Sequence, residues 1–438
     1  MPYALLDTWP DLFAHHAQHP VEFPVLLESG GEQGWDMLMA YPGSVERFFD
    51  DNLAQFFERL HDVWRVTQQP PDLTLAHLPF RGGWLLYLGY EALHVFEPTV
   101  VGWTDRKDDF PQAVLMQIPA AVLQDKVRRQ TWVYADDEVM LRELCVAMQR
   151  PPRLSVDAVD AVSVVGMTEE DANLFLDAVQ KIQAYIAAGD VFQVNLSRRW
   201  QAKVKTSPQA IYRLLRQVNP APFSASVRFS AEHTLLSASP ERLFRRQGSR
   251  LETRPIAGTI ARVTDARQDD QLRAALLAHP KERAEHIMLV DLERNDLGRV
   301  CLPGSIRVEE LMGISTYAFV HHIESTVSGK LRSDIVPLDL LRALFPGGTI
   351  TGCPKVRTMQ IIRELESSPR GAYTGSFGYL NRDGDMDMNI LIRSFAMTGD
   401  QLRFSAGAGI VADSVAVREL AETRAKARGM LRALGIVA

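Results

Sequence analysis

Residues 167–199 read MTEEDANLFLDAVQKIQAYIAAGDVFQVNLSRR, and the spacing of their apolar side chains changes once. In the first part, apolar residues recur at every fourth position: Leu174, Ala178, Ile182 and Ile186. Thr168 and Asp171 form a capping-box pattern before them, and Gly189 supplies a stop signal. The spacing therefore predicts a helix that ends near residue 189.

The second part of the stretch alternates between apolar and polar residues. Apolar Phe192, Val194 and Leu196 are interleaved with three polar residues: Gln193, Asn195 and Ser197. This period of two predicts a strand with one polar face. Such a face normally meets solvent, so solvent is the default interpretation of these residues and a binding site is the alternative.

The rest of the chain mixes the same two kinds of element. Runs at 35–42, 82–91 and 131–136 have strand character, and 138–150 has helical spacing. Residues 151–166, PPRLSVDAVDAVSVVG, open with two prolines and lack helical periodicity. This segment predicts a boundary between an N-terminal region, 1–160, and a C-terminal region, 161–438.

Composition excludes several classes of protein. The 438 residues are 46% hydrophobic and 23% charged, and a formal charge of -6 gives no basic footprint for nucleic acid or anionic membranes. The N-terminus lacks a secretory pattern, and no run of about 18 apolar residues occurs. The three cysteines, Cys145, Cys301 and Cys353, lack metal-binding spacing. We expect a soluble cytoplasmic protein with reduced thiols.

Two predicted helices carry acidic residues on one face. Glu282 and Glu285 are three positions apart within 281–296, and Glu419 and Glu422 are three apart within 413–434, with Lys426 following. Each pair alone is typical of a solvated surface. If the helices converged, the carboxylates would instead offer oxygen ligands to Mg²⁺.

Three glycine-rich stretches suggest close backbone approach to a ligand: PIAGT (255–259), PGGTITGCPK (346–355) and SAGAGIVADS (405–414). The second is not a Walker loop, because Lys does not follow its last glycine. The third lacks the further strand that a dinucleotide fold requires, although a helix N-terminus could still bind an anion there. DGDMDMN (383–389) mimics a calcium loop but lacks its glycine, so it predicts a turn.

Seven ordered stretches between residues 189 and 414 resemble the chorismate-binding enzymes: GDVFQVNLSRR, SASPERLF, RPIAGTIAR, EHIMLVDLERNDLGRV, FPGGTITGCPKVR, GAYTGSFGYL and AGAGIVADS. That family includes anthranilate synthase component I, aminodeoxychorismate synthase component I, and the isochorismate and salicylate synthases. LLES (26–29) and PFRGGWLLYLGYE (79–91) resemble the N-terminal region of the first two. The resemblance implies an α+β fold in which large antiparallel sheets pack face to face with helices on the outside.

The resemblance also implies roles for particular residues. Glu285 and Glu422 match magnesium ligands, with Glu282 and Glu419 beside them, and Glu241 matches the general acid that protonates the departing 4-hydroxyl of chorismate. The positions that match substrate-binding residues are Tyr373, Arg393, Gly407, Lys426, Gly258 and Thr259. His322 matches a histidine near the reacting ring; without the resemblance it would be interpreted as an ordinary packed histidine.

One residue and one loop discriminate between branches of the family. Water-adding members carry a lysine where this chain has Gln193, so Gln193 implies a catalytic site that uses ammonia. FPGGTITG resembles the loop of aminodeoxychorismate synthases more than that of anthranilate synthases. Ala257 is the departure: many aminodeoxychorismate synthases have a nucleophilic lysine there, and anthranilate synthases have alanine. Without it, another nucleophile, such as ammonia itself, must attack C2.

The remaining expectations concern partners. The chain lacks the cysteine, histidine and glutamate pattern of a glutaminase, so ammonia would come from a separate glutamine amidotransferase subunit or from solution. LLES resembles the tryptophan pocket of anthranilate synthases and reads equally well as a strand-to-turn segment. Anthranilate synthase is the alternative enzyme, and a catalytically silent ligand-binding homologue is the alternative of another class.

Overall fold

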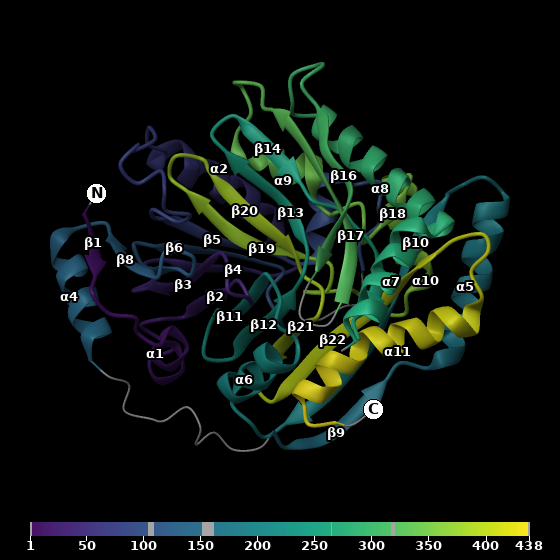
Figure 1. Ribbon diagram of the computed structural model, residues 1–438, viewed down its shortest axis with the longest axis horizontal. Helices are drawn as coiled ribbons and strands as arrows, with labels where there is room; N and C mark the ends of the chain where they lie inside the picture. The colour runs from purple at the N-terminus through teal and green to yellow at the C-terminus, as the bar shows by residue number, and fades with distance from the viewer. Residues whose placement is uncertain (1, 104–108, 151–161, 264, 317–319, 437–438) are drawn as a thin grey trace.

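Strands from distant parts of the sequence lie side by side in two large antiparallel sheets, with helices outside them (Figure 1). The computed structural model describes residues 2–103, 109–150, 162–263, 265–316 and 320–436. The predicted boundary lies mostly within 151–161, outside the described residues. The α+β fold with face-to-face antiparallel sheets is confirmed.

The first sheet has 12 strands in the described part of the chain. Its order is β1 (Tyr3–Leu6), β8 (Gln130–Ala135), β7 (Ala120–Asp125), β3 (Trp35–Ala40), β2 (Val25–Glu28), β11 (Phe223–Arg228), β12 (His233–Ser239), β21 (Ser394–Thr398), β22 (Gln401–Ile410), β10 (Gln193–Val204) and β18 (Gly352–Cys353), with β9 (Val164–Glu169) also paired to β10.

The second sheet has 10 strands in the described residues. Its order is β15 (Ile256–Ala261), β17 (Val320–Lys330), β14 (Arg250–Thr253), β13 (Arg242–Gln247), β20 (Met386–Ile390), β19 (Ser376–Asn381), β5 (Gly83–Leu88), β6 (Ala113–Ile118) and β4 (Val45–Phe48), with β16 (Arg307–Thr316) also paired to β17.

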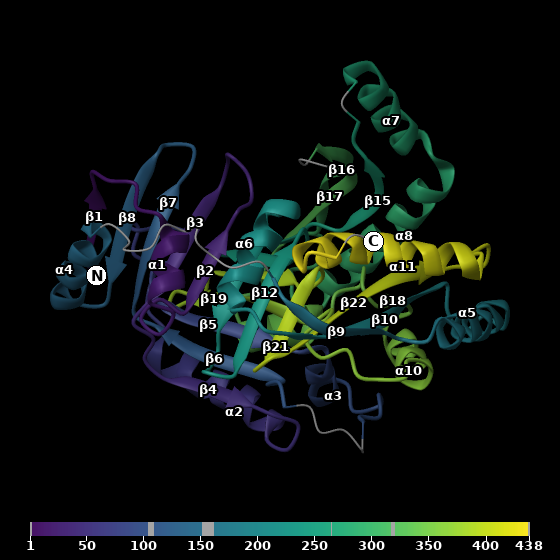
Figure 2. The ribbon, with the colours of Figure 1, turned by 90° about the horizontal axis from the view of Figure 1, so that it is seen from below.

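The helices cover the outer faces of the sheets (Figure 2). They are α1 (Leu12–Gln18), α2 (Leu53–Thr67), α3 (Leu93–Phe96), α4 (Glu138–Gln149), α5 (Ala172–Ala187), α6 (Pro208–Val218), α7 (Ala266–Ala278), α8 (Pro280–Gly298), α9 (Pro337–Leu344), α10 (Lys355–Leu365) and α11 (Ala416–Ala433), with a short 3-10 turn at Tyr90–Ala92.

Strand β5 shows how the core is divided. Its six residues are all buried, because Leu85 and Tyr87 pack between the two sheets while Trp84, Leu86 and Leu88 pack in the cluster that includes α2 and α9. A strand covered on both faces has a continuous apolar run rather than an alternating one. The run at 82–91 is therefore a central strand.

Strands from both sides of residue 160 share each sheet. In the first sheet β2 pairs with β11, and in the second β5 pairs with β19. The N-terminal and C-terminal regions therefore complete the same two sheets.

Two short connections carry the chain between the sheets, and they are hydrogen-bonded to each other. One joins β12 to β13 and contains Glu241, and the other joins β20 to β21 and contains Arg393. The Ile390 amide donates to the Glu241 carbonyl oxygen at 3.0 Å, and the Ala238 amide donates to the Arg393 carbonyl oxygen at 3.1 Å. The paired connections fix Glu241 and Arg393 at the seam between the sheets.

The helix and strand predicted from 167–199 both form, with differences at their starts. Asp171 caps α5 by accepting from the Asn173 amide, but Thr168 lies in β9 opposite Gln201, so the predicted capping box is wrong. Leu174, at the first turn of α5, is 51% exposed. Phe192 precedes β10 and is also exposed, whereas its neighbours Val191 and Gln193 are buried.

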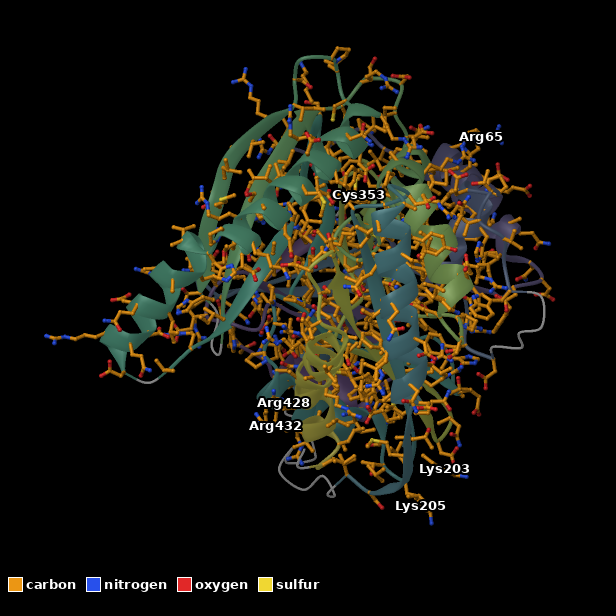
Figure 3. All side chains as sticks on the ribbon, turned by 90° about the vertical axis from the view of Figure 1, so that its right-hand side faces the viewer. Arg65, Lys203, Lys205, Cys353, Arg428 and Arg432 are labelled. Carbon is orange, nitrogen blue, oxygen red and sulfur yellow. The ribbon has the colours of Figure 1, made fainter. Side chains whose placement is uncertain are left out.

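Three smaller features of the sequence have a defined place in the structure. The cysteines are free thiols, and Cys353 (Figure 3) lies in β18 opposite Gln193 of β10. The calcium-like segment turns before β20, and its Asp383 and Asp385 form ion pairs with Arg81. Within the described residues, no helix combines the length and apolarity needed to cross a lipid bilayer.

Replacing Trp200 tests the packing beneath α11. Trp200 is 1% exposed, and its ring stacks on Phe404 with centroids 5.4 Å apart. We expect Trp200→Ala to lower the free energy of unfolding by about 3–5 kcal/mol in urea titrations. Leu174→Ala, at an exposed position, should change it by less than about 0.5 kcal/mol. Equal effects of the two substitutions would contradict this assignment of the core.

Candidate active site

The two helices that carry the acidic pairs converge, as a magnesium site requires. The Lys281 ammonium of α8 lies 3.3 Å from the Asp413 carboxylate, just before α11, and 3.9 Å from Glu285. Figure 2 shows α8 and α11 on the same side of the molecule. The pairs are therefore not two unrelated surface features.

Negative charge accumulates where the helices meet. Burial raises the pKa of Glu285 to about 7, and Glu282, Asp413 and Glu419 contribute to the rise. Burial and the Glu422 carboxylate likewise raise the pKa of Glu419. Among the described residues, no three His, Cys, Asp or Glu side chains are close enough to form a metal-binding group. The structure brings carboxylates together without building a complete protein cage.

Gly258 occupies a bulge in β15, beside the acidic pair of α8. Ala257 lies opposite Ile323 of β17 and Thr259 lies opposite His322, so Gly258 is the extra residue. Its φ of 61° is in the left-handed region, and a Cβ there would lie 3.0 Å from a Glu282 carboxylate oxygen. PIAGT therefore needs glycine both for its backbone conformation and for this close approach.

His322 is buried and uncharged at neutral pH. Burial lowers its pKa to about 4, and the Arg393 guanidinium acts in the same direction. A neutral imidazole can donate one hydrogen bond and accept another. The ring lies near the backbone of Gly258, so the predicted site histidine and the PIAGT bulge are brought together.

Glu241 has the environment expected of a general acid. It is buried, and burial raises its pKa to about 7, against the effects of Thr349 and the Ile256 amide. The Glu324 carboxylate raises the pKa further, and Lys426 lowers it. Its Oε1 atom has no hydrogen-bond partner in the described residues. A carboxyl that keeps its proton near pH 7 can protonate a leaving group.

The polar face of β10 points into the protein and not to solvent. Gln193 is 8% exposed, and its amide fills the space where a Cβ on Gly409 of β22 would lie. The Asn195 Oδ1 atom and the Tyr373 hydroxyl each lie 2.7 Å from the position of a Cβ on Gly407. Neither Gln193 Oε1 nor Asn195 Oδ1 has a hydrogen-bond partner in the described residues. Buried amide oxygens without partners indicate a place for a ligand.

Two cations border the same space. The Lys426 ammonium donates to the Gly407 carbonyl oxygen at 3.0 Å and pairs with the Glu422 carboxylate at 2.7 Å, which ties α11 to β22. Burial lowers the pKa of Arg393, with the Glu241 carboxylate opposing. The Arg393 guanidinium thus lies near the Glu241 carboxylate.

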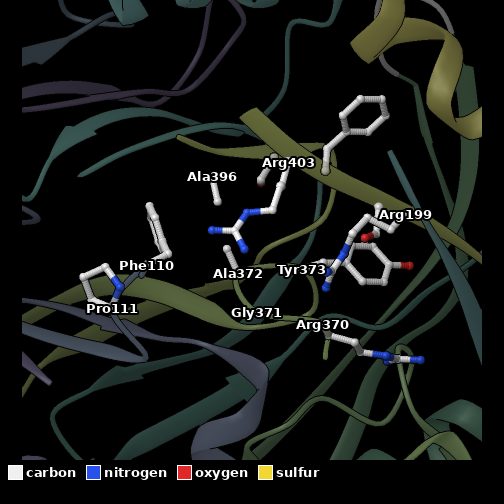
Figure 4. Close-up of a pocket in the computed structure, with 12 residues that line it drawn as sticks. Phe110, Pro111, Arg199, Arg370, Gly371, Ala372, Tyr373, Ala396 and Arg403 are labelled. Carbon is white, nitrogen blue, oxygen red and sulfur yellow. The ribbon is translucent and has the colours of Figure 1, made fainter. Parts of the chain in front are cut away.

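A small cavity lies behind Tyr373 (Figure 4). Its volume is about 20 Å³, enough for one water-sized molecule. The cavity is lined by three arginines, Arg199, Arg370 and Arg403. Two of them form ion pairs, Arg370 with Glu366 and Arg403 with Asp109. The cavity is too small for a ring-sized ligand.

Three further sequence features take a definite place in the structure. Gly407 and Gly409 lie within β22 and α11 begins at Ala416, so these glycines do not form a helix N-terminus. Ser197 shares the polar face of β10 but donates to the Glu366 carboxylate at 2.9 Å, outside the site. LLES forms the strand and turn at β2, where Glu28 accepts from the Tyr212 hydroxyl at 2.8 Å. Tryptophan binding there stays a prediction.

Sequence reasoning missed Glu324 and Arg254. Glu324 is 4% exposed in β17, and its carboxylate pairs with the Arg254 guanidinium at 3.3 Å. Arg254 opens the RPIAGTIAR stretch, and Glu324 lies two residues after His322, on the same face of a strand. The sequence signal for Glu324 was therefore an acidic residue within an otherwise strand-like run.

Comparisons with known proteins agree with this arrangement. The model of the chorismate binding enzyme family matches residues 22–432. The aminodeoxychorismate synthase component 1 of Bacillus subtilis is 50% identical over 260 residues, which are 59% of this chain and 55% of that protein. The anthranilate synthase component 1 of Aquifex aeolicus is 37% identical over 451 residues, covering 95% of this chain and 90% of that protein.

A solved structure shows the same fold. The crystal structure of anthranilate synthase component I from Streptococcus pneumoniae superimposes with a TM-score of 0.80 at 29% identity, covering 90% of this chain and 92% of that one. The match spans strands on both sides of residue 160.

The contact between Gln193 and Gly409 can be tested by adding one methyl group. In Gly409→Ala the new Cβ occupies the place of the Gln193 amide, which must rotate away. We expect the melting temperature to stay close to that of the parent and chorismate turnover to fall by about 100-fold, because a reacting geometry tolerates little displacement.

Gly166→Ala is the matched control, since a Cβ at Gly166 of β9 has no atom within 4 Å. Unchanged turnover in the folded Gly409→Ala protein would show that Gln193 does not act in the site.

Proposed function

The chain belongs to the chorismate-binding enzyme family, and we propose that it converts chorismate and ammonia to 4-amino-4-deoxychorismate. This product leads to p-aminobenzoate and folate. The observation that carries the proposal is Gln193, which is buried against Gly409 where water-adding relatives carry a lysine. Ammonia is already a nucleophile, so a site without that base suits amination.

The position of the amine rests on a different part of the sequence. FPGGTITG resembles the aminodeoxychorismate synthase loop, and the Bacillus subtilis protein with that name is 50% identical over its matched length. Ala257 favours the alternative, anthranilate synthase, which carries alanine there. With Ala257 in place of a lysine, ammonia takes the nucleophile's part at C2, and a second ammonia then enters at C4 as the first amine leaves.

The chain's own residues have separate tasks in this scheme. The Glu241 carboxyl gives its proton to the departing 4-hydroxyl, which leaves as water. Arg393, Tyr373 and the backbone at Gly407 hold the substrate carboxylates. Neutral His322 lies beside the ring and adds no charge to it. The glutamine amidotransferase subunit that would supply ammonia is part of this proposal.

A magnesium ion fits the donor set between α8 and α11. Mg²⁺ prefers carboxylate oxygens, commonly takes one or two protein carboxylates, and keeps several waters. The carboxylates there raise one another's pKa, so a cation among them would relieve repulsion. Glu285 and Glu422 would hold the ion, with Glu282 and Glu419 beside them. When bound, it would neutralise the substrate's ring carboxylate and draw electron density from the ring.

Product identification tests the proposed reaction. With chorismate, Mg²⁺ and excess ammonium salt, we expect chromatography and mass spectrometry to show 4-amino-4-deoxychorismate. Addition of a glutamine amidotransferase subunit and glutamine should replace the need for ammonium. Fluorescent anthranilate would assign the chain to the alternative, and tight chorismate binding without turnover in either assay would indicate a silent homologue.

Glu422→Ala tests the metal proposal. We expect loss of nearly all Mg²⁺-dependent turnover, and loss of the heat released on Mg²⁺ binding in calorimetry, because an oxygen ligand is gone. Glu422 is about half exposed, so the circular dichroism spectrum and melting temperature should not change. Glu364→Ala, on the exposed side of α10, is the control. Wild-type turnover in Glu422→Ala would refute this ligand assignment.

A further inference from the structure

Strand β17 has two faces with different surroundings. Ile323 packs with Leu276 of α7, and the Ser325 hydroxyl bonds the His286 ring of α8 at 2.6 Å. Because successive strand residues point to opposite faces, Glu324 projects away from these helices. It shares its face with His322, which is already placed in the candidate site.

Glu324 is a buried charge with its own counterion. Its side chain is 5% exposed, and the Arg254 guanidinium lies 3.3 Å from its Oε2 atom. Arg254 is 38% exposed and also approaches Glu310, on β16, at 3.9 Å. An arginine remains charged at all accessible pH values and favours the ionised form of a neighbouring carboxylate.

Glu241 lies next to this pair without a comparable partner. Ile256 of β15 is directly opposite Glu324, and its amide faces the Glu241 carboxyl. Glu241 Oε1 lacks a hydrogen-bond partner in the described residues. Two carboxyl groups therefore lie close together in a buried region, and of the two only Glu324 forms an ion pair with an arginine among the described residues. Like charges in such a space do not both ionise readily.

We propose that Glu324 is a positioning residue that acts through charge: held ionised by Arg254, it keeps the neighbouring Glu241 protonated and so available as the acid. The inference rests on the proposed function, which assigns Glu241 to protonate the departing hydroxyl. The C2 ammonium keeps its proton and leaves as ammonia, and Glu241 recovers its proton from the ammonium group formed at C4. The acid is thereby restored at each turnover.

Other charged groups also face Glu241 from the surrounding elements. They are Lys426 of α11, Arg393 of the β20–β21 connection and Glu293 of α8. Lys426 and Arg393 favour the ionised form of Glu241, whereas burial and the Glu293 and Glu324 carboxylates favour its protonated form. Burial is the largest of these influences, and the pKa of Glu241 is raised to about 7. The protonated form therefore predominates below pH 7 and is lost as the pH rises through 7.

The experiment is a pH profile of kcat/KM for chorismate consumption at constant free ammonia. The wild-type profile should fall on its alkaline side near pH 7, where Glu241 loses its proton. In Glu324→Gln we expect this alkaline limb to shift to lower pH by about one unit, since the negative charge that repels an ionised Glu241 is gone. Glu310→Gln is the matched control: it removes another carboxylate near Arg254, but an exposed one.

Two further measurements keep the test decisive. Arg254→Gln should move the limb in the same direction, because an unpaired Glu324 takes up a proton and no longer repels charge on Glu241. In the wild-type chain, carbon-13 NMR should show Glu241 protonated and Glu324 ionised at pH 6. An unmoved limb in folded Glu324→Gln, or the reverse assignment of the proton, would overturn the inference.

These outcomes are separable from those of the proposed function. Chorismate consumption reports the acid step whichever amine product forms. If the product is anthranilate and the alkaline limb still shifts in Glu324→Gln, the proposed reaction is rejected but the role of Glu324 stands. If the product is 4-amino-4-deoxychorismate and the limb does not shift, the proposed reaction stands but the role of Glu324 is rejected.

Discussion

The site depends on the pair of hydrogen-bonded connections at the seam between the two sheets. Because Ile390 and Ala238 donate to the carbonyl oxygens of Glu241 and Arg393, the two chain crossings cannot move independently. One crossing presents an acid and the other a cation, and both reach the same space. Every other element of the site, including β15, β22, α8 and α11, is arranged around this fixed point. The fold thus supplies the geometry of the site before any ligand is bound.

The electrostatics of the site depend on which partner each charged side chain has. Glu324 has an arginine, Lys426 has Glu422 and a backbone carbonyl, and Glu241 has no comparable partner for one of its oxygens. Burial raises the pKa of Glu241 to about 7, because the groups that favour its ionised form act less strongly than burial does. Under the proposed function, chemically identical side chains would serve as acid, counter-charge and metal ligand.

The sequence could predict local elements and matched positions, but not the contacts that join them. The 3.6 and 2.0 periods of residues 167–199 were sufficient for α5 and β10, whereas the choice between Thr168 and Asp171 as a cap depended on the pairing of β9. The family resemblance supplied Glu241 and the acidic pairs. It could not supply Glu324, whose importance comes from Ile256 lying opposite it in β15. Pairing between distant strands is long-range information that no local pattern carries.

The sharing of both sheets by the two ends of the chain has a consequence for biosynthesis. Strand β5 is apolar on both faces, and its neighbour β19 is translated only near the end of the protein. Until then, the nascent chain must leave the ribosome with β5 flanked by an unpaired edge, which is a surface prone to association. Neither sheet can therefore be completed until the strands from the later part of the chain have been made.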